Sequence, residues 1–434
     1  MNSGPSTPVL RLPSRLAILL IVLFGLGAGA EEWPEFRGPT GQGVSQATGL
    51  PVTWGTTKNV AWRVPIDGRG WSSPVVAVGR IYLTTAVPLD GGGRQQSLQA
   101  VCVDAASGAE VWQREIFRPA VGPEGAIHAK NSFASPTPLL NGGRLYVHFG
   151  PYGTAQLDLD GNVLWTNDKI KYDARHGGGG SPIVSGDLLI FNCDGVEAPY
   201  VVALSKDTGE ERWRTPRPDI EPERFSFSTP LEIEVGGERQ IVSAGSSFVC
   251  SYDSVAGAEI WRVGYPRKWS IIPRPVFAEG LVFVCTGYEG PAELLAIRPD
   301  GKGDVTSSHV VWRTDDRIPH TPSPVVSDGK LWMVSDNGIA SCRDATTGEL
   351  HWRKRLGGDY SASPLVAGGR VYFANEEGLC TVLATGERFE RLAKNDMEEP
   401  TLASFAVDGD ALVIRTARQL YRIQDQAVES PAGN

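Results

Sequence analysis

The stretch that decides the fold of this 434-residue chain runs from Asp344 to Trp352, DATTGELHW. Its Thr-Gly pair predicts a tight turn between two strands, and the second strand closes on a Trp. The same phrase, with Gly four residues before the Trp, occurs as DAASGAEVW ending at Trp112, LDLDGNVLW at Trp165, SKDTGEERW at Trp213 and DSVAGAEIW at Trp261. A further copy with an insertion, RPDGKGDVTSSHVVW, ends at Trp312. Self-similarity at this period predicts a repeat architecture.

Each repeat begins with a small residue next to Pro and a short apolar strand, as in SPVVSDGKLWMVS from Ser323 and SPLVAGGRVYFAN from Ser363. Pro is tolerated at the first residue of a strand, and the Gly that follows indicates a hairpin. A third strand then leads into the Gly turn, and the Trp strand is the fourth. No segment of ten or more residues has a convincing helical period, so we expect very little helix.

The count of repeats predicts how the ring closes. The last unit, Pro400–Ile423, has only three strands and lacks a Trp strand, whereas NVAWRV at Asn59–Val64 is a strand with no unit of its own. Pairing the two predicts an all-β, eight-bladed β-propeller, with seven blades as the alternative. We expect an irregular lead-in at 31–58, a single propeller domain at 59–424 and a disordered tail at 425–434.

Residues 1–30 have the pattern of a signal peptide: Arg11 and Arg15, an apolar run at Leu16–Leu26, and Ala-Gly-Ala before residue 31. The run is shorter than the roughly 20 residues that span a bilayer as a helix. We therefore expect an exported protein, periplasmic or extracellular, with no membrane span in the mature form. A short N-terminal membrane anchor is the alternative.

The charge and the cysteines exclude some classes of function. Removing residues 1–30 takes away two Arg and no acid, so the formal net charge changes from −9 to −11. An acidic surface argues against general binding to nucleic acid or to anionic membranes. Three of the six Cys occupy equivalent positions in different repeats, too far apart for disulfides, so buried single thiols are expected.

The turn-and-Trp phrase resembles the repeat of PQQ-like (quinoprotein-type) propellers over about residues 60–423. That group includes quinoprotein alcohol dehydrogenases and the lipoprotein of the outer-membrane BAM complex. The opening WPEFRGPTGQGV, Trp33–Val44, with the full layout resembles exported propellers of planctomycete-type bacteria. The resemblance implies that each blade's Trp docks against the neighbouring blade. The residues concerned are Trp62, Trp112, Trp165, Trp213, Trp261, Trp312 and Trp352.

The chain departs from quinoprotein dehydrogenases where their chemistry resides. It has no adjacent Cys-Cys pair and no C-x-x-C-H haem motif, and no calcium-binding Glu/Asn/Asp set can be matched. It also lacks G-x-S-x-G and H-E-x-x-H, and no pair of carboxylates can be nominated as acid and base. We therefore predict no catalytic residue, no metal and no cofactor, and PQQ with calcium only under the alternative of a dehydrogenase.

A ligand site is predicted at the mouth of the central channel, from the residues that precede the first strand of each repeat. Arg offers paired donors to an anion, and aromatic rings stack on sugar faces. The candidates are Arg69, Trp71, Lys130, Asn131, Arg175, His176, Arg224, Arg267, Trp269, Arg317, His320 and Tyr360. The alternative is that these charges pair with acidic loops of the same face.

The run ARHGGGGSP, Ala174–Pro182, invites comparison with a phosphate-binding loop, but a strand follows it and not a helix. Crowding of the backbone near the channel is the better explanation.

The function predicted is an exported, non-catalytic propeller that acts as a binding or scaffold module. Its partner would be a protein, or an anionic ligand or glycan at the channel mouth. One alternative is a PQQ- and calcium-dependent alcohol or sugar dehydrogenase. The other is a divergent channel enzyme acting on polysaccharide.

Overall fold

The computed structural model describes residues 31–425 apart from 90, 92–93, 121–126, 219–224, 266 and 289, and also Met1 and Gly4. The described residues from Glu31 onward form one compact unit. The predicted signal peptide and most of the predicted tail, like Arg224, lie outside the described residues. No helix in the described part of the chain is long and apolar enough to cross a membrane.

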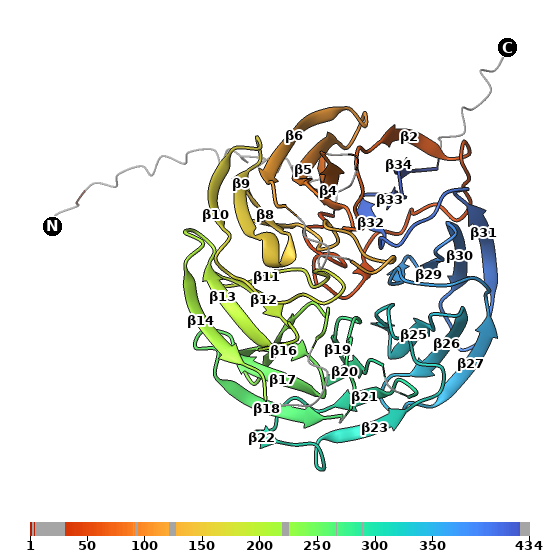
Figure 1. Cartoon of the computed structure of the whole chain (residues 1–434). Coiled ribbons are helices and arrows are strands. Elements are labelled where there is room, and N and C mark those ends of the chain that lie inside the picture. The colour runs from red at the N-terminus through yellow and green to blue at the C-terminus, as the bar shows by residue number, and fades with distance from the viewer. Residues whose placement is uncertain are drawn as a thin grey trace. The chain divides into compact units, whose positions relative to one another are not determined.

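The described part of residues 31–434 is an eight-bladed β-propeller, as predicted, and each blade is a four-stranded antiparallel sheet (Figure 1). The first four blades are β3–β6 (Val75–Ala77, Arg80–Pro88, Gln96–Asp104, Glu110–Phe117), β7–β10 (Leu139–Asn141, Arg144–His148, Thr154–Asp158, Val163–Asn167), β11–β14 (Ile183–Ser185, Leu188–Cys193, Tyr200–Ser205, Glu211–Pro216) and β15–β18 (Leu231–Val235, Glu238–Ala244, Phe248–Asp253, Glu259–Gly264). A short 3₁₀ helix, Gly150–Tyr152, lies between the second and third strands of the second blade.

The remaining blades follow in chain order. They are β19–β21 with β23 (Val276–Ala278, Leu281–Cys285, Leu294–Ile297, Val310–Thr314), β24–β27 (Val325–Ser327, Lys330–Val334, Ile339–Asp344, Leu350–Arg355), β28–β31 (Leu365–Ala367, Arg370–Ala374, Leu379–Ala384, Arg391–Asp396) and β32–β34 (Ala406–Asp408, Ala411–Arg415, Gln419–Ile423) with β2 (Val60–Pro65). Two short strands add parallel edges, β1 (Val44–Ser45) to blade 7 and β22 (Gly303–Asp304) to blade 4.

The propeller closes as predicted from the N-terminal strand at Asn59–Val64. The N-terminal strand β2 pairs antiparallel with β34, and Arg63 lies opposite Tyr421. In Figure 1 the two strands lie side by side although they come from opposite ends of the unit. Closure of this kind leaves only short outer edges exposed on each blade.

Five of the seven Trp dock on a Gly turn of the next blade: Trp62, Trp112, Trp165, Trp213 and Trp312. The Gly turns of Gly108, Gly161, Gly209, Gly257 and Gly348 have φ between +69° and +85°. A Cβ at any of them would lie 2.5–2.8 Å from the Trp ring of the preceding blade. Glycine is therefore required twice, for the left-handed backbone and for the contact.

Five of the seven Trp also donate their indole N–H to a carbonyl of the next blade. Trp62 reaches Ala105 at 2.9 Å, and Trp112, Trp165, Trp312 and Trp352 make the corresponding bond at 3.0–3.1 Å. Trp261 differs because the insertion before Trp312 forms β22 beside it, and its N–H bonds Gln240 of its own blade.

A β-bulge precedes the Trp position in all eight blades, between the third and fourth strands. The bulge adds one residue to the fourth strand and turns its side chains relative to the sheet. In blade 7 the register places Ala393 at the Trp position. Phe389, just before this strand, packs edge-on against Trp352 at 5.3 Å.

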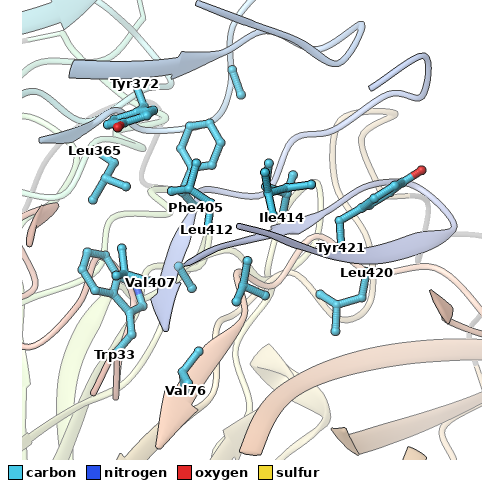
Figure 2. Packing of buried hydrophobic residues seen from close by; sticks show 14 of the residues in the cluster. Trp33, Val76, Leu365, Tyr372, Phe405, Val407, Leu412, Ile414, Leu420 and Tyr421 are labelled. Carbon is cyan, nitrogen blue, oxygen red and sulfur yellow. The ribbon is translucent and has the colours of Figure 1, made fainter. Parts of the chain in front are cut away.

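The core consists of apolar clusters between neighbouring blades, and the lead-in belongs to one of them. Trp33 is 1% exposed and packs with Val76 of β3, Leu365 of β28 and Val407 of β32 (Figure 2). Trp33 of the lead-in is therefore part of the hydrophobic core. All six Cys are buried and free, which confirms the prediction of single thiols.

Candidate ligand chamber

A cavity of about 610 Å³ occupies the central channel. A volume in this range suits a small organic ligand. The cavity is lined by the residues that precede the innermost strands, together with Phe36 of the lead-in and Tyr288 of blade 5. We call it the chamber.

Seven hydroxyls form a ring in the wall of the chamber. Seven blades contribute a Ser or Thr two residues before the innermost strand, and each of these residues is 2–6% exposed. These residues are Ser73, Thr137, Ser181, Thr229, Ser323, Ser363 and Ser404. Each hydroxyl oxygen accepts the backbone N–H of the equivalent residue in the preceding blade at 2.9–3.1 Å. We call this set the hydroxyl ring.

The protons of the hydroxyl ring have no acceptor among the described residues. Within the described residues, none of the seven hydroxyls donates to another group, although each accepts one bond. A buried O–H needs an acceptor, so these donors are directed to whatever fills the chamber, water or ligand.

Blade 5 breaks the ring because Arg274 stands where the other blades have a hydroxyl. Its backbone N–H still donates to Ser323, but its side chain turns away to the lead-in. The guanidinium donates to the carbonyl of Phe36 at 2.7 Å and lies 3.4 Å from the carboxylate of Glu35. Burial raises the pKa of Glu35, although Arg274 opposes this shift.

The lead-in crosses the channel at one end of the chamber. It exchanges backbone bonds between Trp33 and Val76 at 2.8 Å, and the backbone N–H groups of Leu140, Phe277 and Val366 donate to Pro34, to the side chain of Gln42 and to Gly43. These partners all lie three residues beyond a ring position. The lead-in therefore sits about 10 Å deeper than the ring, at the rise of ~3.3 Å per strand residue, and Phe36 forms the floor.

Arg37, next to the floor, anchors the lead-in to blade 6. Its side chain is buried and donates to the carbonyl of Pro324 at 2.6 Å and to that of Gln42 at 2.8 Å. Burial lowers the pKa of Arg37 to about 9, so the group remains a cation at neutral pH.

Charged groups meet at the mouth of the chamber. The Lys130 ammonium lies 2.7 Å from the carboxylate of Glu376, which also accepts from the Ser361 hydroxyl at 2.6 Å. Burial lowers the pKa of Lys130, but the hydrogen bond and charge of Glu376 outweigh it, so the pKa is raised. Lys130 lies in the loop after blade 1, and Glu376 lies in a loop within blade 7. The ion pair therefore joins two loops that are far apart in the sequence.

Aromatic rings form much of the wall above the hydroxyl ring. Trp269 and Tyr288 are joined by backbone bonds of 2.8 and 3.3 Å, and Tyr288 stacks on His320 at 4.4 Å. On another side, the ring of His176 lies 5.7 Å from that of His128 and 5.5 Å from that of Phe225. His176 has a φ of +68°, a backbone conformation that only surrounding contacts stabilise.

The structure places five of the predicted site residues in the chamber wall: Trp71, Lys130, Asn131, His176 and Trp269. Three more lie beside it. Arg69 bonds the carbonyl of Ala129 at 2.6 Å, Arg175 lies over the ring of Phe225 at 5.2 Å, and the backbone N–H of His320 bonds Asp336.

The other predicted residues lie apart from the wall. Arg267 and Arg317 are exposed at the rim, and both have positive φ. Tyr360 is fully buried in the core cluster between blades 6 and 7. Pairing with acidic loops, the alternative that the sequence left open, occurs at Lys130–Glu376 and His320–Asp336. The carboxylate of Asp194 does not pair with a predicted site residue; it forms a buried ion pair with Arg217.

Sequence reasoning missed the hydroxyl ring, Phe36, Phe227 and Tyr288. The ring had a visible signal, because a Ser or Thr beside Pro begins nearly every repeat. That signal indicates only where a strand starts. The glycine run, in contrast, behaves as expected: a Cβ on Gly178 would lie 2.9 Å from Gly150, so crowding of the backbone accounts for it.

The chamber does not fit a calcium-held quinone. Calcium takes carboxylate and carbonyl oxygens, and the lining contains no Asp or Glu among the described residues. No group of three or more His, Cys, Asp or Glu in the described part of the chain could hold a metal ion.

Fold and chamber together define an eight-bladed PQQ-like propeller whose channel is crossed at one end by the lead-in. The family described as outer membrane protein assembly factor BamB matches residues 60–219, 197–303 and 301–419. The chain therefore belongs to this family.

Similar proteins have different functions. The structure of BamB from Moraxella catarrhalis matches with a TM-score of 0.58 and 13% identity, covering 84% of this chain and 99% of that one. Quinohemoprotein alcohol dehydrogenase from Comamonas testosteroni matches with a TM-score of 0.52 and 12% identity, covering 93% of this chain and 82% of that one. Both show likeness of fold.

Among curated proteins, methanol dehydrogenase [cytochrome c] subunit 1 of Methylobacterium organophilum is 26% identical over 143 residues. The match takes in 29% of this chain and 22% of that protein, so the chain spans about a fifth of the relative's length.

Proposed function

We propose that this protein is an exported binding module whose chamber holds an acidic glycan, without catalysis. The observation that carries the proposal is the one-sided chemistry of the wall. The described lining has seven hydroxyl donors and the Lys130 ammonium, which also pairs with Glu376 at the mouth, and it contains no carboxylate.

This imbalance selects the ligand by its oxygens. A neutral sugar presents hydroxyls that both donate and accept, and a site for it gains from carboxylate acceptors. A carboxylate on the ligand only accepts, so it fits a wall of donors and makes stronger, charge-assisted bonds. A sugar acid therefore matches this wall better than a neutral sugar does.

The aromatic wall supports a sugar over a small inorganic anion. Trp71, Trp269 and Tyr288 line the chamber with apolar faces. An inorganic anion would gain nothing from these surfaces, whereas the C–H face of a sugar ring buries apolar area against them.

The same lining supports the proposal of binding without cleavage. Glycoside hydrolysis by the common mechanisms needs two carboxyl groups on either side of the bond. The described chamber wall supplies none, which argues against a polysaccharide-cleaving enzyme. Membership of a family named for an assembly factor supports a binding or scaffold role, and the predicted signal peptide supports export.

The test is titration calorimetry with a hexamer of galacturonic acid and with its fully methyl-esterified form. The two probes share size and sugar faces and differ in charge. We expect the acid to bind at least about tenfold more tightly, since charge-assisted bonds are worth about 1.5–3 kcal/mol. Equal affinities, or no binding of either probe, would overturn the proposal.

Two variants separate the chamber from bulk charge. Lys130→Gln removes a cation from the wall and leaves Glu376 unpaired at the mouth, so affinity for the acid should fall. Arg391→Gln removes a cation from the exposed edge of β31 and should leave affinity unchanged. Chromatography of the probes after incubation should show intact hexamer, and shortened products would instead indicate the enzyme.

A further inference from the structure

We propose that the chamber binds the terminal sugar unit of an acidic glycan, and that the hydroxyl ring binds the carboxylate of that unit. This inference rests on the proposed function and adds how the ligand enters, which end of the chain is recognised and which donors recognise it.

The first step is the closed floor. The lead-in is hydrogen-bonded to the innermost strands of blades 1, 2, 5 and 7, and Arg37 bonds the carbonyl before the innermost strand of blade 6. Five of eight blades therefore hold it in the channel, below the hydroxyl ring. A chain that enters at the mouth meets Phe36 and cannot thread through, so only its end can reach the ring.

The second step is the orientation of the donors. Each ring hydroxyl is fixed by the N–H that it accepts, which leaves its proton free to turn toward the chamber. Seven such donors, on residues buried to at least 94%, surround a single space. Donors that are held in place by a rigid fold bind an anion with little loss of entropy.

The third step is the gap at blade 5. Arg274 withdraws from the ring toward Glu35, and Ile272, Trp269 and Tyr288 form the wall on that side. The terminal unit therefore meets donors on most of its circumference and an apolar surface on one side. A sugar acid has such an arrangement, with oxygens at its edge and a C–H face.

The experiment measures how many protein molecules bind to each glycan molecule. Galacturonic acid trimer, hexamer and long polygalacturonate are titrated in the calorimeter, and the stoichiometry is checked by sedimentation. Recognition of the end predicts a constant number of proteins per chain as the chain lengthens. Recognition of internal units predicts a number that grows with length. That outcome would overturn this inference and leave the proposed function intact, whereas failure of every acidic probe to bind would overturn both.

Variants of the ring test the donors. Thr137→Val keeps the shape and removes the hydroxyl, and Thr137→Ser keeps the hydroxyl. We expect the Val variant to bind the trimer about tenfold more weakly and the Ser variant to bind normally, given the strength of one bond to a charged group. Because Val also leaves the N–H of Ser73 unpaired, melting temperatures are measured in parallel. If a folded Thr137→Val variant binds the trimer as tightly as the wild type does, the hydroxyl ring does not bind the carboxylate. If the variant does not fold, the binding stoichiometry decides the inference.

Discussion

Gly348 lies under the indole of Trp312, so close that a Cβ on residue 348 would sit 2.8 Å from the ring. Gly348 also has a φ of +77°. We therefore expect Gly348→Ala to cost the left-handed strain of about 1–2 kcal/mol and, in addition, about 1–3 kcal/mol for overpacking. Urea unfolding measures the loss.

Gly329→Ala is the matched control. Gly329 has a φ of +69°, and a Cβ added to it would meet nothing within 4 Å. The substitution should cost only the backbone strain. Equal losses at the two positions would show that docking of the Trp adds nothing.

The buried pair Asp194–Arg217 should stabilise the junction of blades 3 and 4. Arg217 donates to Asp194 at 2.9 Å and to the Ser243 hydroxyl of β16 at 2.7 Å, and both charged side chains are at most 1% exposed. Arg217→Met leaves a buried carboxylate without its partner, so we expect a loss of about 3–5 kcal/mol in unfolding free energy.

An exposed pair provides the comparison. Arg118 lies 2.9 Å from Glu115 at the end of β6, and its side chain is 56% exposed. Arg118→Met should change the unfolding free energy by less than about 1 kcal/mol. A similar loss in both variants would mean that burial does not govern these pairs.

His148 should make the protein less stable in acid. The residue is 1% exposed on β8, its ring packs 4.4 Å from that of Phe191, and burial lowers its pKa to about 3. In the unfolded chain the imidazole has its ordinary pKa near 6.5, so below that pH the unfolded state binds a proton that the folded state does not. Stability is therefore lost as pH falls from about 6.5 to about 3, by up to ~1.4 kcal/mol per pH unit.

His148→Gln should flatten this dependence by about 2–3 kcal/mol between pH 6 and pH 4. Urea unfolding across that range measures it. Gly329→Ala, which changes no titratable group, should keep the slope of the wild type. Parallel curves for His148→Gln and the wild type would contradict the prediction.

PQQ with calcium should not bind in the chamber, because its described wall offers no carboxylate for the ion. After incubation with both and gel filtration, we expect no quinone absorbance with the protein peak and no change in melting temperature. A retained quinone spectrum that EDTA abolishes would restore the dehydrogenase alternative.

The blade count could be predicted from the sequence because its signals are local. A Gly turn and a Trp four residues later fall within one hairpin, and the bulge that orients the Trp lies between the same two strands. Even closure by residues 59–64 could be inferred, because the last unit lacked one strand. Trp71 and Lys130 could be placed near the mouth for a similar reason, since both lie in the segment that leads into an innermost strand.

Some predicted site residues do not line the chamber because their side chains point elsewhere. Tyr360 precedes its strand as Trp71 does, yet its side chain points between blades into the core. Arg267 and Arg317 occupy left-handed turns that hold them at the rim. Sequence position places a residue at the mouth but does not say where its side chain points.

The sequence by itself determined the architecture: eight blades, their turns and the docking Trp residues from patterns within single repeats, and the closing strand from the strand that the last unit lacks. Only the tertiary structure decided that the channel is a chamber. Its floor joins Phe36 to Arg274, and its ring joins Ser404 to Ser73. Such contacts link residues hundreds of positions apart, and no local pattern encodes them, because they exist only once the ring has closed.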